Sequence, residues 1–171
     1  ADLSEPELGA VVRAGPALVK VSDDELVNDG RAASNSARDV AAAMEDLATE
    51  GAHVVAVTRA ERPTLALVDG QLWSMSAPSF VPVETAGGGD SFTAGCAAAL
   101  AAGDAPLTAL RLGSAAGALN VTRRGLGSGR ADTIRQAAGH VRVHPVDDID
   151  AVDEVEPDDP DHPDDLDERL G

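Results

Sequence analysis

A strand–helix–strand pattern near the start of the chain constrains its fold more than any other feature. Residues 17–21 and 53–58 are short Val-rich runs bounded by Gly, Pro or charged residues, as is typical of β-strands. Between them, residues 36–50 place apolar side chains on one helical face, with Ser36 positioned to cap the helix and Gly51 to end it. These lengths predict a right-handed crossover and at least one parallel pair of strands.

Two more strands and two helices are expected further along. Residues 64–68 and 71–75 are apolar runs joined by Asp69-Gly70, a strong hairpin signal. Residues 91–102 form a predicted helix of small side chains, which allow close packing against neighbouring elements. A second helix is expected from the turn at 104–106 towards Thr122, followed by a glycine-rich loop.

The acidic charge is concentrated at the C-terminus. Of 171 residues, 43% are apolar, which is enough for one core. Residues 147–171 carry −12 of the formal charge of −17 and few large apolar side chains, so we predict a packed region over 1–146 and a disordered acidic tail over 147–171. A well-solvated segment without a specific role is the first interpretation of the tail, and a regulatory segment is the second. A polyanion repels phosphate backbones and anionic lipids, so neither nucleic acid nor a membrane is an expected partner.

Composition also bears on the setting in which the chain works. Lys20 is the only lysine, and abundant Ala, Asp and Glu with few aromatic residues resemble the proteins of salt-loving archaea. We therefore expect a halophilic protein, whose surface repulsion is screened by salt. The first residues lack a signal-peptide pattern and no later run has the length of a membrane span, so a cytoplasmic location is predicted. Cys96, the only cysteine, is expected to be a buried and inert thiol.

The segment Gly87-Gly88-Gly89-Asp90 is the candidate site for chemistry. Three glycines before a helix let the backbone adopt positive φ and turn several N–H groups towards one point. The first helical turn adds unpaired N–H groups and the positive end of the helix dipole. Together they predict an anion hole for a phosphoryl group. Asp90 is either a general base that accepts the proton of an attacking hydroxyl or only the N-cap of the helix.

Two other phosphate-binding motifs do not fit this segment. A Walker loop requires Gly-Lys followed by Ser or Thr, and no lysine follows Lys20. A dinucleotide fingerprint counted from Gly87 requires glycine where Phe92 stands.

Residues 84–95, Glu-Thr-Ala-Gly-Gly-Gly-Asp-Ser-Phe-Thr-Ala-Gly, resemble the signature of the ribokinase (PfkB) type of carbohydrate kinases. That signature is usually Asp-Thr-x-Gly-Ala-Gly-Asp, followed by Phe, a small residue and Gly. The resemblance implies that Gly87, Gly88 and Gly89 form the anion hole and that Asp90 is the catalytic base. It also implies the fold class α/β, as a partial ribokinase-like three-layer α/β/α domain with a mainly parallel sheet.

Residues 18–26 resemble the family stretch Lys-Pro-Asn-x-x-Glu-Leu, in which the lysine and asparagine approach the nucleotide phosphates and metal. Lys20 matches the lysine, and Ser22 stands where asparagine is usual. The resemblance therefore implies that Lys20 and Ser22 bind nucleotide.

Residues 54–70 resemble the strand and hairpin beside the adenine pocket, which implies that Thr58 and Arg59 line the triphosphate path. Arg59 is either a phosphate partner or a surface arginine. The helix containing residues 115–120 resembles the one that covers the adenine, and Asn120 is its nucleotide-binding candidate.

The implied cofactors are ATP and Mg²⁺, with K⁺ as an additional cation. Many family members bind a monovalent cation through backbone oxygens of the segments that match Glu84, Ala86, Arg123 and Gly125. No metal site built from protein side chains is predicted, because Pro145 and a strand-like run argue against His140 and His144 as a helical pair.

The implied function is ATP-dependent phosphorylation of a sugar or sugar phosphate. A 1-phosphofructokinase-like activity on a phosphorylated hexose such as fructose 1-phosphate is favoured, with 2-keto-3-deoxygluconate next. Residues 1–146 match only the C-terminal, nucleotide-binding half of the family pattern, so the expected partner is a missing N-terminal half or a homodimer partner. The alternative is a non-catalytic nucleotide-binding remnant, or half of a split enzyme, without the sugar-binding and lid region.

Overall fold

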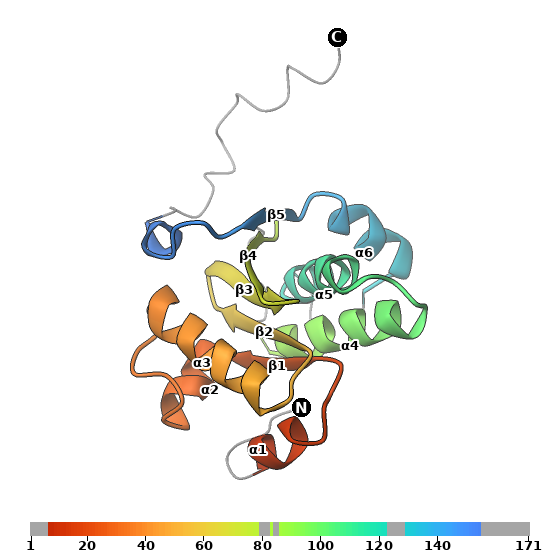
Figure 1. Ribbon diagram of the computed structural model, residues 1–171. Helices are drawn as coiled ribbons and strands as arrows, with labels where there is room; N and C mark the ends of the chain where they lie inside the picture. Colours follow the sequence, from red (N-terminus) through yellow and green to blue (C-terminus); the bar gives the residue numbers. More distant parts are fainter. Residues whose placement is uncertain (1–6, 79–82, 84–85, 123–128, 155–171) are drawn as a thin grey trace.

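The computed structural model describes residues 7–78, 83, 86–122 and 129–154 (Figure 1). The elements, in chain order, are α1 (Glu7–Val12), β1 (Val19–Ser22), α2 (Asp23–Asn28), α3 (Ala37–Glu50), β2 (Val54–Arg59), β3 (Arg62–Val68), β4 (Gln71–Ser76), α4 (Gly88–Ala101), α5 (Pro106–Asn120), α6 (Ala131–Ala138), β5 (Arg142–Pro145) and the 3-10 helix η1 (Asp150–Asp153). The strands and helices expected from the sequence are all present. The largest shift in a boundary is at α4, which begins at Gly88 and not at Ser91.

The sheet has the strand order β1-β2-β3-β4-β5. The crossover through α3 makes β1 and β2 parallel, with Val19 opposite Val55 and Ser22 opposite Thr58. The pairs β2–β3, β3–β4 and β4–β5 are antiparallel, so the expectation of a mainly parallel sheet is wrong for the described residues. For β2–β3 and β3–β4 the reason is local, because connections as short as Asp69-Gly70, with φ of 50° and 77°, return the chain antiparallel.

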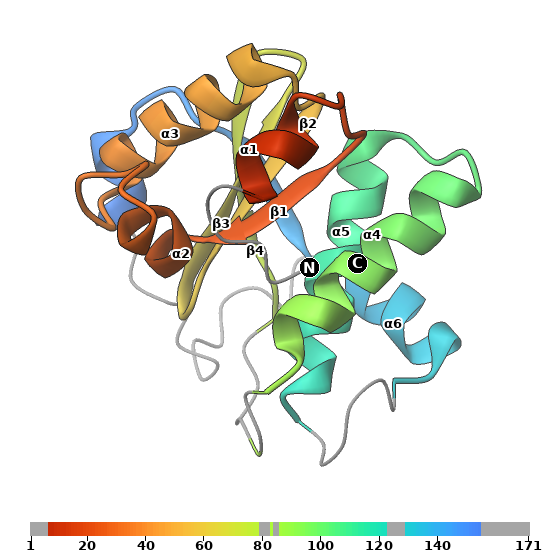
Figure 2. The ribbon, with the colours of Figure 1, turned by 90° about the horizontal axis from the view of Figure 1, so that it is seen from below.

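Helices cover both faces of the sheet, which confirms the three-layer α/β/α arrangement (Figure 2). Alternate residues of β2 divide between the two cores. Val55 and Val57 pack with α1, α2 and α3, whereas Val54 and Ala56 pack with α4 and α5. The two faces of the sheet therefore carry separate sets of functional candidates.

The helices α4 and α5 pack closely through small residues, as predicted. A Cβ added to Gly113 would lie 2.3 Å from Cys96 Sγ, and one added to Gly95 would lie 3.0 Å from Gly113 Cα. Burial raises the pKa of Cys96 to about 12, so the thiol stays protonated and inert at neutral pH. In the part of the chain that the structure describes, no helix combines the length and the apolar character needed to cross a lipid bilayer.

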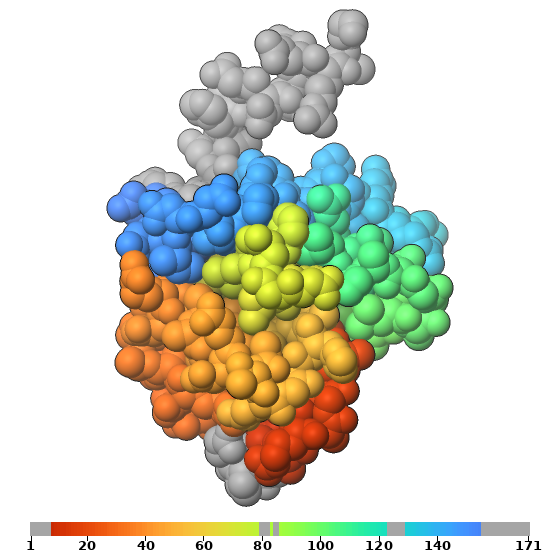
Figure 3. Space-filling view, in the orientation of Figure 1, coloured from red at the N-terminus to blue at the C-terminus, as the bar shows by residue number. Residues whose placement is uncertain are grey.

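The start of the predicted acidic tail packs onto the domain. Residues 147–154 include η1, whose Val152 is buried in the core beneath α3, and Asp153 accepts a hydrogen bond from Ala37 N at 2.7 Å. Figure 3 shows this segment in blue against the orange surface of α3. The expectation of disorder from Asp147 therefore does not hold for residues 147–154. This segment has few apolar side chains, but Asp153 binds Ala37 N and Arg59, and Val152 is buried. The rest of the predicted tail lies outside the described residues.

Candidate active site

The glycine run forms the start of α4. Gly87 is the N-cap in a left-handed conformation, with φ 78° and ψ 5°, and no side chain caps the helix. Gly88 and Gly89 already have helical positions, so positive φ is confined to Gly87. The first intrahelical bond runs from Ser91 N to Gly87 O at 3.0 Å, which leaves the N–H groups of the first turn directed out of the helix. The left-handed conformation of Gly87 alone is therefore enough to leave the backbone N–H groups of the first helical turn without an intrahelical partner.

Asp90 is the third residue of α4 and not its N-cap, so the capping interpretation is wrong. Its side chain is exposed and forms no hydrogen bond or ion pair with any other described residue. An acidic group in the first turn still interacts favourably with the helix dipole. The carboxylate is nevertheless available to a ligand, and the role of Asp90 as a base stays a prediction.

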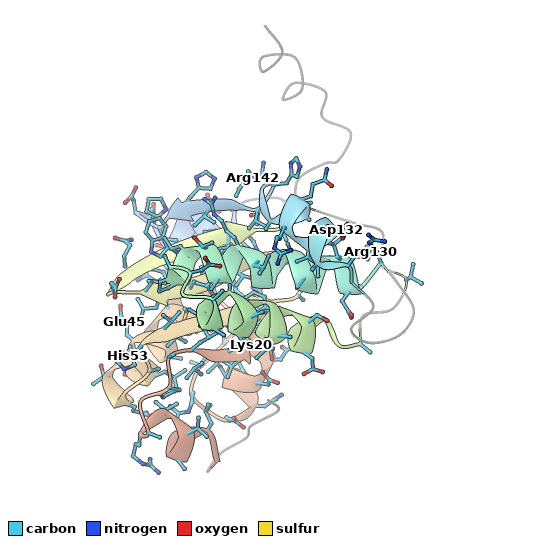
Figure 4. All side chains as sticks on the ribbon, turned by 90° about the vertical axis from the view of Figure 1, so that its right-hand side faces the viewer. Lys20, Glu45, His53, Arg130, Asp132 and Arg142 are labelled. Atoms are coloured by element: carbon cyan, nitrogen blue, oxygen red, sulfur yellow. The ribbon has the colours of Figure 1, made fainter. Side chains whose placement is uncertain are left out.

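Lys20 lies beside this helix start. Val19 and Val21 are buried on the α3 face of the sheet, so the alternation of β1 directs Lys20 to the opposite face, towards α4 (Figure 4). A Cβ added to Gly89 would lie 2.9 Å from Lys20 Nζ. Two candidates that are distant in sequence therefore meet, and their meeting depends on the missing side chain at position 89.

Ser22 and Thr58 are neighbours at the carboxyl ends of β1 and β2. Thr58 Oγ1 donates to Val21 O at 3.5 Å. Ser22 caps α2: its hydroxyl accepts from Glu25 N at 3.2 Å, and its own N–H donates to Glu25 Oε2 at 2.5 Å. Ligands of α/β proteins commonly bind at this edge of parallel strands. Ser22 has a structural role that the sequence interpretation did not include, and its contact with nucleotide remains a prediction.

The C-terminal end of α5 holds the glycine loop in place. Asn120 is buried and donates from Nδ2 to Ala86 O at 3.0 Å, while Val121 O accepts from Val83 N at 2.7 Å. A Cβ added to Gly117 would lie 3.0 Å from Gly88 O, so a glycine is needed there for this approach. Asn120 was predicted as a nucleotide ligand, and the structure gives it the additional role of anchoring the loop.

The predicted monovalent cation site is described only in part. Ala86 is exposed, and its carbonyl oxygen accepts the hydrogen bond from Asn120. Glu84, Arg123 and Gly125 lie outside the described residues. The cation site therefore stays a prediction.

Arg59 lies on the other face of the sheet from Lys20. It is buried, which makes the surface interpretation wrong, and its Nη2 donates to Asn35 O at 3.1 Å and to the carboxylate of Asp153. Nothing in this geometry directs the guanidinium towards Gly89. The alternation of β2 provided the relevant signal, because Arg59 follows Val55 and Val57 at every second position.

Free N–H groups at a helix start, a lysine beside them and an available carboxylate define an α/β protein with a site suited to phosphoryl groups. Residues 3–134 match the model of the pfkB family carbohydrate kinases, so the chain belongs to this family. A comparison with curated protein sequences gives no match.

The fold resembles solved structures of similar proteins. Phosphofructokinase-2 from Escherichia coli, solved in complex with potassium, has a TM-score of 0.71 and 23% identity, with 80% of this chain and 45% of that chain covered. Arabidopsis thaliana ribokinase, complexed with ribose and ATP, has a TM-score of 0.69 and 20% identity, with 81% and 45% covered. The chain thus spans about half the length of the solved structures that it matches. Together these likenesses show a ribokinase-like α/β fold with a mixed sheet.

Proposed function

We propose that this chain is the nucleotide-binding half of an ATP-dependent carbohydrate kinase. The observation that carries the proposal is the position of Lys20 Nζ, which would lie 2.9 Å from a Cβ on Gly89 at the uncapped start of α4. A cation and several N–H groups that converge on one point are suited to the phosphates of ATP. Family membership supports the same reaction class.

Each residue then has a defined role in the transfer. The N–H groups of Gly88, Gly89 and Asp90 stabilise the negative charge that develops on the transferred phosphoryl group, and Lys20 contributes its positive charge. The Asp90 carboxylate accepts the proton of the attacking sugar hydroxyl. A bond forms from that oxygen to phosphorus while the bond to the ADP oxygen breaks. Because this transition state is loose, positioning contributes more than base strength.

The residues present fit ATP accompanied by Mg²⁺. Within the described ranges, no three His, Cys, Asp or Glu side chains gather to hold a metal ion. Mg²⁺ at nucleotide sites typically binds through substrate phosphates and one or two carboxylates, so it needs no such cluster. Bound with ATP, it would neutralise phosphate charge. The potassium complex of phosphofructokinase-2 supports K⁺ as a further cation, for which Glu84, Ala86, Arg123 and Gly125 are the proposed segments.

The sugar pocket belongs to a second half or a homodimer partner in this proposal. The chain covers about half of its structural neighbours, and β1 has a strand neighbour only on its β2 side among the described residues. The free edge of β1 gives such a half a place to extend the sheet. Phosphofructokinases among the neighbours support a sugar phosphate as acceptor, in line with a 1-phosphofructokinase-like enzyme.

A second candidate is a non-catalytic nucleotide-binding remnant, which would keep Lys20 and the uncapped start of α4 without performing the transfer. The two are separated by incubating the chain with a complementing N-terminal half, ATP and candidate sugars. Sugar-dependent release of ADP is the expected result. ATP binding without any release would overturn the kinase proposal and leave the remnant.

A further inference from the structure

A second charged cluster lies at the same end of the sheet as Lys20 but on the α3 face. Its centre is Arg59, whose side chain has no exposed area. Only Nη2 is hydrogen-bonded, to Asn35 O and to Asp153, whereas the buried Nε and Nη1 have no partner in the described part of the chain. Burying a guanidinium whose donors are not all paired costs folding free energy. The pairing with Asp153, the one carboxylate among the described residues that binds Arg59, offsets part of this cost.

The carboxylate of Asp153 is held by three different elements. Besides Arg59 of β2, the backbone N–H of Ala37 at the start of the 14-residue helix α3 donates to it at 2.7 Å. Arg62 of β3 lies 3.9 Å away and is itself anchored to the buried Asp23 at 2.7 Å. A helix N-terminus and two guanidinium groups around one carboxylate are the components of a built anion site.

The segment that carries Asp153 has few other attachments. Val152 is the only buried residue of η1, and the Asp150–Arg38 ion pair is about two-thirds exposed on both sides. Ile149, just before η1, also packs half-buried against the same core, so the hold of this segment on the domain depends on one carboxylate and two apolar side chains.

We propose that Arg59, Arg62 and the Ala37 N–H form a carboxylate-binding site and that the Asp153 carboxylate occupies this site reversibly. The occupied site holds the β2–β3 turn, where Ala60 has a φ of 50°, beside the strand end that carries Thr58. When the Asp153 carboxylate leaves the site, this turn becomes more mobile and the affinity for nucleotide falls. This last step rests on the proposed function, whereas the carboxylate site itself does not.

The first experiment measures thermal unfolding of the full 171-residue chain by circular dichroism. Asp153→Ala is expected to lower the Tm by about 5–10 °C, because it leaves the Arg59 charge buried and unpaired. Sodium formate should restore most of this loss in the variant, since a free carboxylate can pair with the vacated donors of Arg59. Sodium chloride at the same ionic strength should restore much less.

Asp150→Ala is the matched control, because it removes the same charge from the same segment but from an exposed pair. It should melt within about 1–2 °C of the wild-type chain and show no preference for formate. If Asp153→Ala does not fold in dilute buffer, formate-dependent recovery of the circular dichroism signal replaces the Tm. Wild-type melting of Asp153→Ala, or equal recovery with chloride and formate, would overturn the carboxylate site.

The second experiment measures ATP binding by calorimetry for the wild-type chain and both variants. Asp153→Ala should bind ATP at least about 5-fold more weakly than Asp150→Ala, at the lower end of typical coupling between sites. Equal affinities would overturn the coupling. A wild-type chain that binds no ATP would overturn the proposed function and the coupling with it, while the formate experiment still decides the carboxylate site.

Discussion

Lys20 of β1 and Gly89 of α4 are close neighbours. The Lys20 ammonium group lies so near Gly89 that a side chain at position 89 would clash with it. A Cβ at position 89 would come within 2.9 Å of Lys20 Nζ and 3.6 Å of Cε. The contact joins the only lysine of the sequence to the helix start with the free N–H groups. This pair is therefore the part of the site most sensitive to a small change in shape.

Gly89→Ala is expected to weaken ATP binding by about 10-fold, because the methyl group displaces the ammonium from the anion hole. Folding should not suffer, since the end of a lysine side chain moves easily and Ala has a higher helix propensity than Gly by up to about 1 kcal/mol. Calorimetric titration and thermal melting measure the two effects separately.

Gly88→Ala provides the control for this change. Its Cβ would lie 3.4 Å from Val121 Cγ1 and 3.8 Å from Gly117 O, which are ordinary contact distances. ATP binding should remain near that of the wild-type chain. Equal losses of affinity in the two variants would contradict the specific role of the Lys20–Gly89 contact.

Thermal stability should rise as KCl increases from dilute to molar concentration. The formal charge of −17 repels itself in dilute buffer, and salt screens that repulsion. Calorimetric scans across a KCl series measure the effect. A melting temperature that stays constant or falls would contradict the halophilic interpretation.

Two truncations should behave differently. Deleting residues 155–171 is expected to leave the melting temperature nearly unchanged. Deleting residues 147–171 also removes Val152 and Asp153 and should cost about 2–4 kcal/mol, from lost apolar burial and an uncompensated Arg59. Urea unfolding of both chains measures this difference, and equal stabilities would show that η1 contributes nothing to the fold.

Asp153 also predicts how stability depends on pH. Partial burial by itself raises the pKa of Asp153, but the Ala37 N–H and the charges of Arg59 and Arg62 outweigh it and lower the pKa below the ordinary 3.8. The ionised group therefore contributes stability above about pH 4, and this contribution is lost as the pH falls through the folded-state pKa. Urea unfolding between pH 6 and 3 should lose less stability in Asp153→Asn than in the wild-type chain. The same acid sensitivity in both would contradict the prediction.

Local patterns in the sequence were sufficient for most of the fold and for the position of the glycine run at the start of α4, whereas Lys20 was selected through the family resemblance. Periodicity and turn residues predicted the crossover around α3, the Asp69-Gly70 hairpin and the small-residue helices. For the sheet, the prediction that failed was the mainly parallel arrangement, where family resemblance was given more weight than the hairpin signal. The start of α4 was predicted too late because glycine is a poor helix former, while the hydrogen bond from Asn120 to Ala86 O holds the chain just before the first turn.

The Arg59–Asp153 pair was not predictable in the same way. Its partners are 94 residues apart in the sequence, and the composition around Asp153 is that of a solvated tail. The alternation of β2, which the sequence interpretation did not apply to Arg59, places this side chain towards the core, but a buried arginine requires a counter-charge that local patterns cannot locate. Only the folded chain shows which of its thirty acidic residues supplies that charge.

The most direct test of the proposed kinase is Asp90→Asn in the chain assembled with its complementing half. ATP affinity should be almost unchanged, because the substitution leaves the N–H groups of the α4 start and Lys20 in place. Turnover of sugar, followed by ADP release, should fall by ~10²–10⁴-fold, the usual contribution of a positioned general base. Full turnover in Asp90→Asn would contradict the assignment of Asp90 as the base and the mechanism built on it.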